Sequence, residues 1–189
     1  MTRRTLLSVL LAALTALTTL SVAHPAGAGE PTEQLKFDIA RVFRALESPA
    51  RREAVHTVSR DLFDWTEMAR RSLGRYWQAL TEAEREEFTG LLGRLVNARL
   101  ITLAGWTGNG VEYVDEAVDD DVAMVQTKIA LTSGRPMSLD YRMIRRGGRW
   151  LIYDVVLDGT SMVGNYRAQF THIMKTASYE KLIEKLTTQ

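Results

Sequence analysis

The spacing of apolar residues changes once along the chain, and this change limits the fold more than any other feature. Before the glycine-rich segment 105–110 (GWTGNG), apolar residues recur every three or four positions, which is typical of amphipathic helices. After it they alternate with polar residues, which is typical of half-buried strands. We predict strands at about 111–117, 122–132, 136–145 and 149–157. The connections between them are too short for a crossover helix, so the strands should pair as an antiparallel meander.

Helices are predicted both before and after the sheet, and capping residues give most of their starts. Ser48 precedes Pro49, Asp64 and Thr81 each precede a glutamate by three positions, and Ser161 follows the last strand. We predict helices over 32–47, from Pro49, from Asp64 to Gly74, from Thr81, from Ser161 and over 179–186. The fold class is therefore α+β: a single domain whose four-stranded antiparallel meander packs with a mostly N-terminal set of helices and with C-terminal helices.

Residues 1–28 have the pattern of a secretory signal peptide. A pair of arginines precedes an apolar run over 6–20, and small residues follow up to an Ala-Gly-Ala cleavage site. A helix of about 15 residues spans only about 22 Å of a membrane core roughly 30 Å thick, so a signal is favoured over a membrane anchor. The arginine pair leaves both Sec and twin-arginine export open. We expect residues 29–189 to form the mature domain, located in the periplasm.

The composition excludes several classes of protein. The chain has no cysteine, which removes disulfide scaffolds, thiolate metal sites and cysteine nucleophiles. It has 24 Lys and Arg against 23 Asp and Glu. Two of the basic residues, Arg3 and Arg4, belong to the signal segment, so the mature domain has 22 basic and 23 acidic residues. This balance provides no polybasic surface for nucleic acid. An exported domain also meets no ATP, which makes kinases, ATPases and nicotinamide enzymes poor candidates.

Residues with catalytic potential are few and scattered. His56 and His172 lie in separate predicted helices, outside any metal-binding spacing, and no serine-nucleophile motif occurs. The acidic run 119–121 and the basic run 145–149 are interpreted as solvated hairpin turns; for the basic run, a docking or lipid-headgroup patch is the alternative. We therefore expect no catalytic residue, no metal and no cofactor.

One face of the predicted sheet is broad, apolar and contains two methionines and two tyrosines. Its members are Val125, Thr127, Ile129, Leu131, Met137, Leu139, Tyr141, Met143, Leu151, Tyr153, Val155 and Leu157. Flexible methionines suit a cavity whose guest varies, and tyrosines combine an apolar wall with a polar tip. Helices that close this face as a solid core explain the pattern equally well, so the residues leave both interpretations open.

Two segments resemble a known family. The first consists of FDWTEMAR at 63–70 and LGRYW at 73–77; the second consists of WLIYDV at 150–155, DGTS at 158–161 and NYRAQF at 165–170. Their order and separation resemble the MlaC family, also called toluene-tolerance auxiliary proteins, over essentially the whole mature chain.

The resemblance implies a soluble periplasmic carrier and no enzyme. Members of the family hold glycerophospholipid by its acyl chains. They shuttle it between an outer-membrane lipoprotein complex and an inner-membrane ABC transporter with an MCE-domain protein, which maintains the lipid asymmetry of the outer membrane. No cofactor and no catalytic residue come with the family.

The lining of the lipid cavity is predicted here from periodicity. From the sheet we expect Val125, Ile129, Leu139, Tyr141, Met143, Tyr153 and Val155. From the helices we expect Leu92, Leu95, Val96, Met162, Tyr166 and Phe170. We also expect Asp154, Asn165 and Arg167 to form a structural polar network, with an ion pair from Arg167 to Asp154 or Asp158.

Two other functions remain open. The first is a small periplasmic enzyme acting on an apolar substrate in a cone-shaped α+β pocket, which would need an isolated acid with a raised pKa inside the pocket. Asp140 and Asp154 are predicted on the opposite face of their strands, which argues against it. The second is a structural or adaptor domain with a solid core and no ligand.

Overall fold

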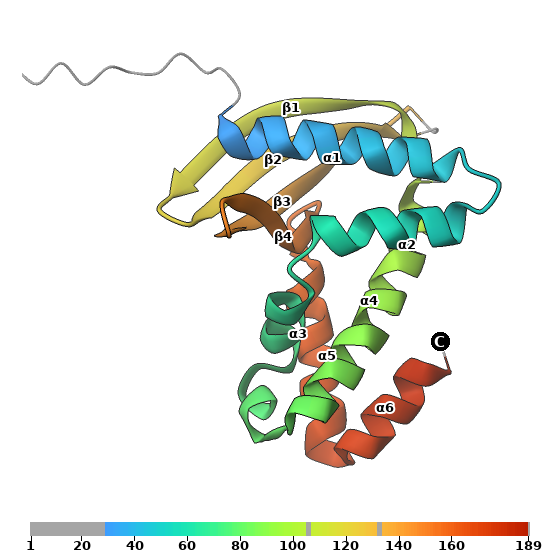
Figure 1. The fold of residues 1–189 in the computed structure, drawn as a ribbon, viewed down its shortest axis with the longest axis vertical. Coiled ribbons are helices and arrows are strands. Elements are labelled where there is room, and N and C mark those ends of the chain that lie inside the picture. Colours follow the sequence, from blue (N-terminus) through green and yellow to red (C-terminus); the bar gives the residue numbers. More distant parts are fainter. Residues whose placement is uncertain (1–28, 105–106, 132–133, 189) are drawn as a thin grey trace, which may run out of the picture.

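The computed structural model describes residues 29–104, 107–131 and 134–188. The predicted signal segment, residues 1–28, lies outside the described residues. Within them the chain forms six α-helices, one 3₁₀ helix and one antiparallel sheet, which confirms the α+β class (Figure 1). The elements are α1 Glu30–Leu46, α2 Arg51–Leu62, α3 Trp65–Leu73, η1 Gly74–Ala79, α4 Glu82–Ala104, β1 Thr107–Asp119, β2 Val122–Leu131, β3 Pro136–Arg146, β4 Arg149–Leu157, β5 Thr160–Ser161, α5 Met162–Thr176 and α6 Tyr179–Thr187.

The sheet is a meander in the order β1-β2-β3-β4-β5, with each pair antiparallel, as the short connections require. It has five strands where four were predicted. The additional strand, β5, is only two residues long and pairs with Val156 and Leu157 of β4. A segment of that length shows no alternation, so periodicity could not reveal it.

Most helix ends follow the predicted capping residues. The Asp64 carboxylate accepts a hydrogen bond from the Glu67 amide at 2.9 Å, and the Ser161 hydroxyl accepts one from the Gly164 amide at 2.8 Å. Gly74, at φ +57°, ends α3. The start of α2 was predicted wrongly: it begins at Arg51, because the Ser48 hydroxyl instead accepts from the Ala50 amide at 3.2 Å and closes a turn.

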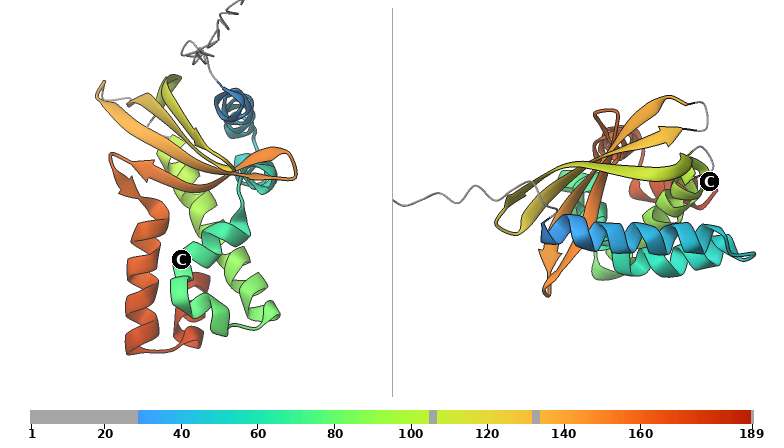
Figure 2. Two further views of the ribbon diagram at one scale, coloured as in Figure 1. Left: turned by 90° about the vertical axis from the view of Figure 1, so that its left-hand side faces the viewer. Right: turned by 90° about the horizontal axis from the view of Figure 1, so that it is seen from above.

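The helices form two groups around the sheet. Figure 1 shows α1 and α2 beside the sheet and α3 to α6 as a bundle extending from the β4 side; the view from above in Figure 2 shows α1 and α2 side by side. The α1 helix is tied to two separate strands of the meander, β1 and β4. The Thr32 amide donates to Glu116 of β1 at 2.7 Å, and Gln34 accepts from the Trp150 amide of β4 at 2.9 Å.

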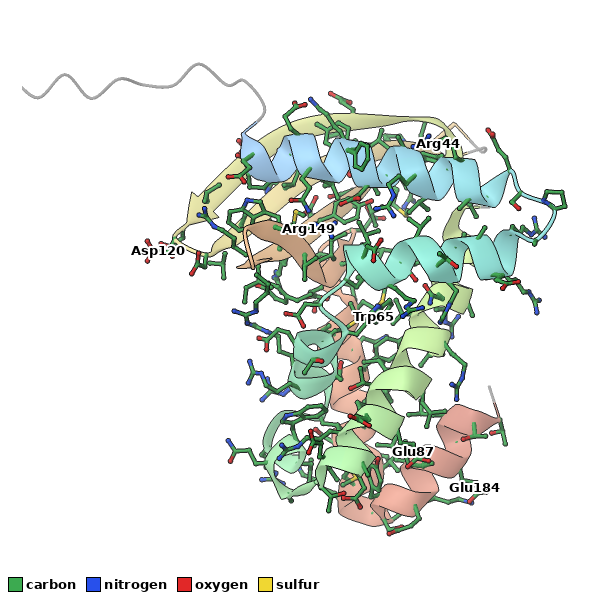
Figure 3. All side chains as sticks on the ribbon, in the orientation of Figure 1. Arg44, Trp65, Glu87, Asp120, Arg149 and Glu184 are labelled. Atoms are coloured by element: carbon green, nitrogen blue, oxygen red, sulfur yellow. The ribbon has the colours of Figure 1, made fainter. Side chains whose placement is uncertain are left out.

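Trp65 connects the two helical groups. In Figure 3 it lies between α2 and α4. Its indole N–H donates to the Ser59 carbonyl of α2 at 3.2 Å, and its ring packs against Gly93 of α4. It also contacts the Phe63 ring, with centroids 4.7 Å apart. Trp65 therefore fixes the bundle against the α1–α2 pair.

A β-bulge in β4 changes which of its residues face the core. Arg142 pairs with Asp154 and Met143 pairs with Ile152, so Tyr153 is an extra residue on β4. Because the bulge interrupts the alternation, Trp150 and Ile152 are buried on the face expected for Leu151 and Tyr153. The prediction that Tyr153 shares the inner face with Tyr141 is therefore wrong. Strict counting in twos cannot detect an inserted residue.

Asp154 is the polar link between β4 and α5, but with different partners from those predicted. Its carboxylate accepts from the Ser161 hydroxyl at 2.6 Å and the Val163 amide at 2.9 Å, and pairs with Arg142 at 3.0 Å. Within the described part of the chain, Arg167 pairs with neither Asp154 nor Asp158. The neighbouring strand already supplies a cation to Asp154, and Arg167 lies close to Gly74 instead.

Among the helices of the described residues, none combines the length and the apolar character that a membrane crossing requires.

Candidate functional site

An apolar cavity, here called the slot, lies between α1, α2, the end of α4 and the inner face of the sheet. Its volume is about 80 Å³. Its lining consists of Ile39, Val42, Phe43, Leu46, Leu62, Phe63, Leu100, Val111, Ile129, Leu139, Tyr141 and Ile152. An apolar cavity of about 150 Å³ can hold a benzene molecule, so the slot as it stands has room for only part of a narrow apolar chain.

A second and larger cavity, here called the groove, lies between α4, α5, α6 and the β4–β5 turn, and has a volume of about 510 Å³. Its apolar lining consists of Leu95, Leu100, Leu157, Met162, Tyr166, Phe170, Ile173, Leu182 and Leu186. Its polar lining consists of Arg99, Thr102, Thr160, Ser161, Asn165, Gln169 and Lys185. The groove thus has the size and the mixed chemistry of a site for an amphipathic molecule.

The slot and the groove meet at Leu100, which lines both. Their walls are also continuous across the sheet. Leu139 of β3 lines the slot, and the residue paired with it on β4, Leu157, lines the groove. A small cluster of leucines therefore lies between a narrow apolar cavity and a wider, partly polar one.

The apolar floor of the groove is ordered by aromatic packing. The Tyr166 and Phe170 rings stack with centroids 5.5 Å apart, and the Phe170 ring meets Phe88 of α4 edge-on at 5.6 Å. These contacts fix α5 against α4 and leave Leu95 and Met162 beside them at the groove surface.

Tyrosines near the slot are held uncharged. Burial raises the pKa of Tyr113 to about 12, and Glu33 adds to this effect. Burial also raises the pKa of Tyr141, with Tyr113 and Asp140 adding to it. Both hydroxyls therefore stay protonated far above neutral pH. The slot presents an uncharged polar atom at most, which suits an apolar guest.

These pKa values predict an alkaline loss of stability. An unfolded tyrosine ionises at about pH 10, whereas the folded Tyr113 and Tyr141 stay protonated to higher pH, so stability is complete below about pH 10 and declines above it. Between about pH 8 and about pH 11, we expect the free energy of unfolding to fall by about 1 kcal/mol less in Tyr141→Phe than in the wild type. Chemical denaturation at the two pH values measures this difference. Equal losses in the two proteins would show that Tyr141 ionises normally.

The structure divides the thirteen predicted lining residues into four sets. Ile129, Leu139 and Tyr141 line the slot, and Leu95, Met162, Tyr166 and Phe170 line the groove. Five are buried in the hydrophobic core and line neither cavity: Leu92, Val96, Val125, Met143 and Val155. Tyr153 lies in a shallow depression on the other sheet face, beside Met124 and Arg142, with the Arg71 guanidinium 4.2 Å from its ring centre.

The wall of the slot that α1 and α2 provide was not predicted from the sequence. This wall consists of Ile39, Val42, Phe43, Leu46, Leu62 and Phe63. The spacing of apolar residues predicted the α1 helix and its buried face, but it does not predict which part of the sheet that face packs against. Leu100 was also missed, since nothing in the sequence distinguishes it from the other inward leucines of α4.

The basic hairpin 145–149 is held by local contacts. Arg145 pairs with Asp121 at 3.2 Å and stacks on the Trp150 ring. Arg146 pairs with Asp64 at 3.3 Å, and Arg149, labelled in Figure 3, donates to the Asp61 carbonyl at 3.3 Å. These arginines fasten the hairpin to the rest of the fold, which accounts for them without a ligand.

Comparison with known proteins gives two findings. Residues 38–188 match the family model described as MlaC protein. The fold is similar to the solved structure of a phospholipid-binding protein from Ralstonia solanacearum in complex with a phospholipid, with a TM-score of 0.71 and 21% sequence identity. The match covers 85% of this chain and 96% of that chain.

Proposed function

Because this chain belongs to the MlaC family, we propose that it is a carrier that binds a glycerophospholipid by its acyl chains. We propose that residues 1–28 are a signal peptide and that residues 29–189 carry the lipid through the periplasm. The acyl chains occupy the apolar part of the groove and extend past Leu100 into the slot, while the headgroup stays at the polar mouth. The phospholipid complex of the similar Ralstonia solanacearum protein supports this assignment.

The observation that carries the proposal is that a narrow apolar cavity and a wider amphipathic groove share Leu100 in their linings. A phospholipid has the same division along its length. The slot of about 80 Å³ is smaller than an acyl chain, so α1 and α2 must move away from the sheet when a chain enters.

The energetics suit a carrier. Burying about 30 methylenes contributes on the order of 24 kcal/mol at about 0.8 kcal/mol each, and a bilayer offers the lipid nearly the same. A carrier therefore needs an affinity for the lipid close to that of the bilayer, so that modest free energies of docking decide the direction of transfer. We propose as docking partners an outer-membrane lipoprotein complex and an inner-membrane ABC transporter with an MCE-domain protein. The exchange between them would maintain outer-membrane lipid asymmetry.

The two alternative functions have less support. An enzyme of the type considered needs an acid inside its pocket, and the described lining of the slot and the groove contains no Asp, Glu or His. Asp154 lines neither cavity, and its carboxylate accepts hydrogen bonds from the Ser161 hydroxyl and from the Val163 amide of α5. An adaptor without a ligand gives no reason for the apolar lining of the groove, which a lipid chain would cover.

Native mass spectrometry of protein purified without detergent tests the proposal. We expect a bound mass equal to one diacyl phospholipid and phosphorus in the organic extract. Protein that contains no lipid, and takes none up from vesicles, would refute the carrier function.

Substitutions at Leu100 test the path between the two cavities. We expect Leu100→Trp to block the path and lower bound phospholipid about tenfold, because an indole at the junction keeps the terminal methylenes out of the slot. We expect Leu100→Ala to retain lipid and to exchange it faster with vesicles. Ala98→Trp is the matched control, since Ala98 is exposed on the same helix. Normal lipid content in a folded Leu100→Trp protein would exclude this path.

A further inference from the structure

The groove carries positive charge without a compensating acid. Among the described residues of its lining, the charged side chains are Arg99 of α4 and Lys185 of α6. Neither takes part in an ion pair with any other described residue. Most basic side chains near the sheet hairpins, such as Arg145 and Arg146, do have carboxylate partners. The two groove cations are thus available to a ligand.

Arg99 is an exposed residue of the groove lining, on the same wall as Leu95 and Leu100 of α4. Burial raises the pKa of Tyr166, and the positive charge of Arg99, which lines the same groove, opposes this rise. Lys185 lies next to the buried Leu186 on the side of α6 that lines the groove. Arg99 of α4 and Lys185 of α6 therefore line one groove from two different helices.

Neutral polar groups complete the polar lining of the groove. The Asn165 and Gln169 amides lie one turn apart on α5 and are joined by a hydrogen bond of 3.3 Å. Thr160 adds a hydroxyl from β5. Amides and hydroxyls can bind the hydroxyls of a polyol headgroup, but they cannot neutralise an ammonium group.

We propose that Arg99 and Lys185 hold the phosphate of the lipid, so that the carrier prefers phospholipids whose headgroup has a net negative charge. This inference rests on the proposed lipid-carrier function and defines the substrate class of that site. Every phospholipid brings a phosphate to these cations. A zwitterionic headgroup also brings an ammonium into a groove that has two cations and, in its described lining, no carboxylate.

Competitive loading tests this preference. The mature protein is incubated with vesicles of equimolar phosphatidylglycerol and phosphatidylethanolamine with identical acyl chains, and the bound lipid is quantified by mass spectrometry. We expect about fivefold enrichment of phosphatidylglycerol at low salt, falling towards equality at high salt, because the charges are partly exposed and screened. Arg99→Gln combined with Lys185→Gln should bring the ratio of the two bound lipids near one.

The matched control is Arg94→Gln combined with Lys181→Gln. These residues are exposed on the same two helices, lie outside the groove, and carry the same total charge. Lys181 pairs with Glu184, which Figure 3 places on the outer side of α6. We expect the wild-type lipid ratio from this control. An equal ratio in the wild type, or the same loss of preference in control and groove variants, would overturn the inference.

A second arm separates lipid phosphate from free phosphate. Lipid-free protein is titrated with inorganic phosphate and with a short-chain phosphatidylglycerol. We expect only the lipid to bind measurably at millimolar concentration, and equal affinities would overturn the inference in favour of a general anion site. Absence of any bound lipid in the wild type would refute the carrier function itself, whereas lipid bound without headgroup preference would refute the charge selection alone.

Discussion

Replacing Val42 with tryptophan is expected to lower the phospholipid content of the purified protein at least about tenfold. Val42 is a half-buried residue of α1 that lines the slot, whose volume is about 80 Å³. An indole in its place fills the space that an acyl chain would enter. Exclusion of only two methylenes costs about 1.6 kcal/mol, which corresponds to about a 15-fold change in affinity. Extracted phosphorus per protein and native mass spectrometry measure the effect.

The same helix provides the control for this substitution. Phe37 is 62% exposed, so Phe37→Trp adds an indole to α1 without reaching the slot and should leave the lipid content unchanged. Overpacking at Val42 costs about 1–3 kcal/mol of stability, and circular dichroism will show whether the variant stays folded. A folded Val42→Trp protein with the lipid content of the wild type would mean that acyl chains do not use the slot.

Replacing Asp154 with alanine is expected to have the largest effect on stability. Asp154 is 2% exposed and accepts hydrogen bonds from Ser161, Val163 and Arg142. Its loss leaves three donors without their acceptor, including a charged one, which costs about 3–4 kcal/mol. For a domain of this size we expect the unfolding temperature to fall by about 10 °C. Because the same bonds fix the start of α5, a wall of the groove, we also expect faster loss of bound lipid.

An exposed ion pair serves as the control for Asp154. Asp61 of α2 pairs with Arg41 at 3.1 Å and is largely exposed, so Asp61→Ala should cost less than about 1 kcal/mol. Thermal unfolding followed by circular dichroism compares the two variants. If Asp154→Ala and Asp61→Ala had the same unfolding temperature, the hydrogen bonds at Asp154 would not be what holds α5 in place.

Local signals in the sequence were sufficient for most of the fold. The carboxylate of Asp64 and the hydroxyl of Ser161 cap the helices that their spacing predicted. Both interactions join residues three positions apart, so they do not depend on the rest of the molecule. The meander also followed from local information, because three connections too short for a helix permit only antiparallel neighbours.

The lining of the site was predicted less well, and the errors have specific causes. The bulge at Tyr153 shifts the alternation of β4 by one residue. Ile152 therefore lies on the inner face and lines the slot, whereas Tyr153 was predicted on that face. Val125 and Met143 lie on the inner face as predicted, yet both are sealed in the core. Facing inward is a property of the strand, whereas lining a cavity depends on what packs opposite.

The sequence by itself determined the elements, their order and the antiparallel pairing of the sheet, because these depend on periodicity, capping and connection length over short distances. Only the tertiary structure decided where the apolar surfaces fail to meet. The path of α1 over the sheet and the position of α6 against α4 and α5 leave space on both sides of Leu100, and they bring Arg99 and Lys185 to one groove. A cavity is the space that remains between elements distant in the chain, so no single segment encodes it.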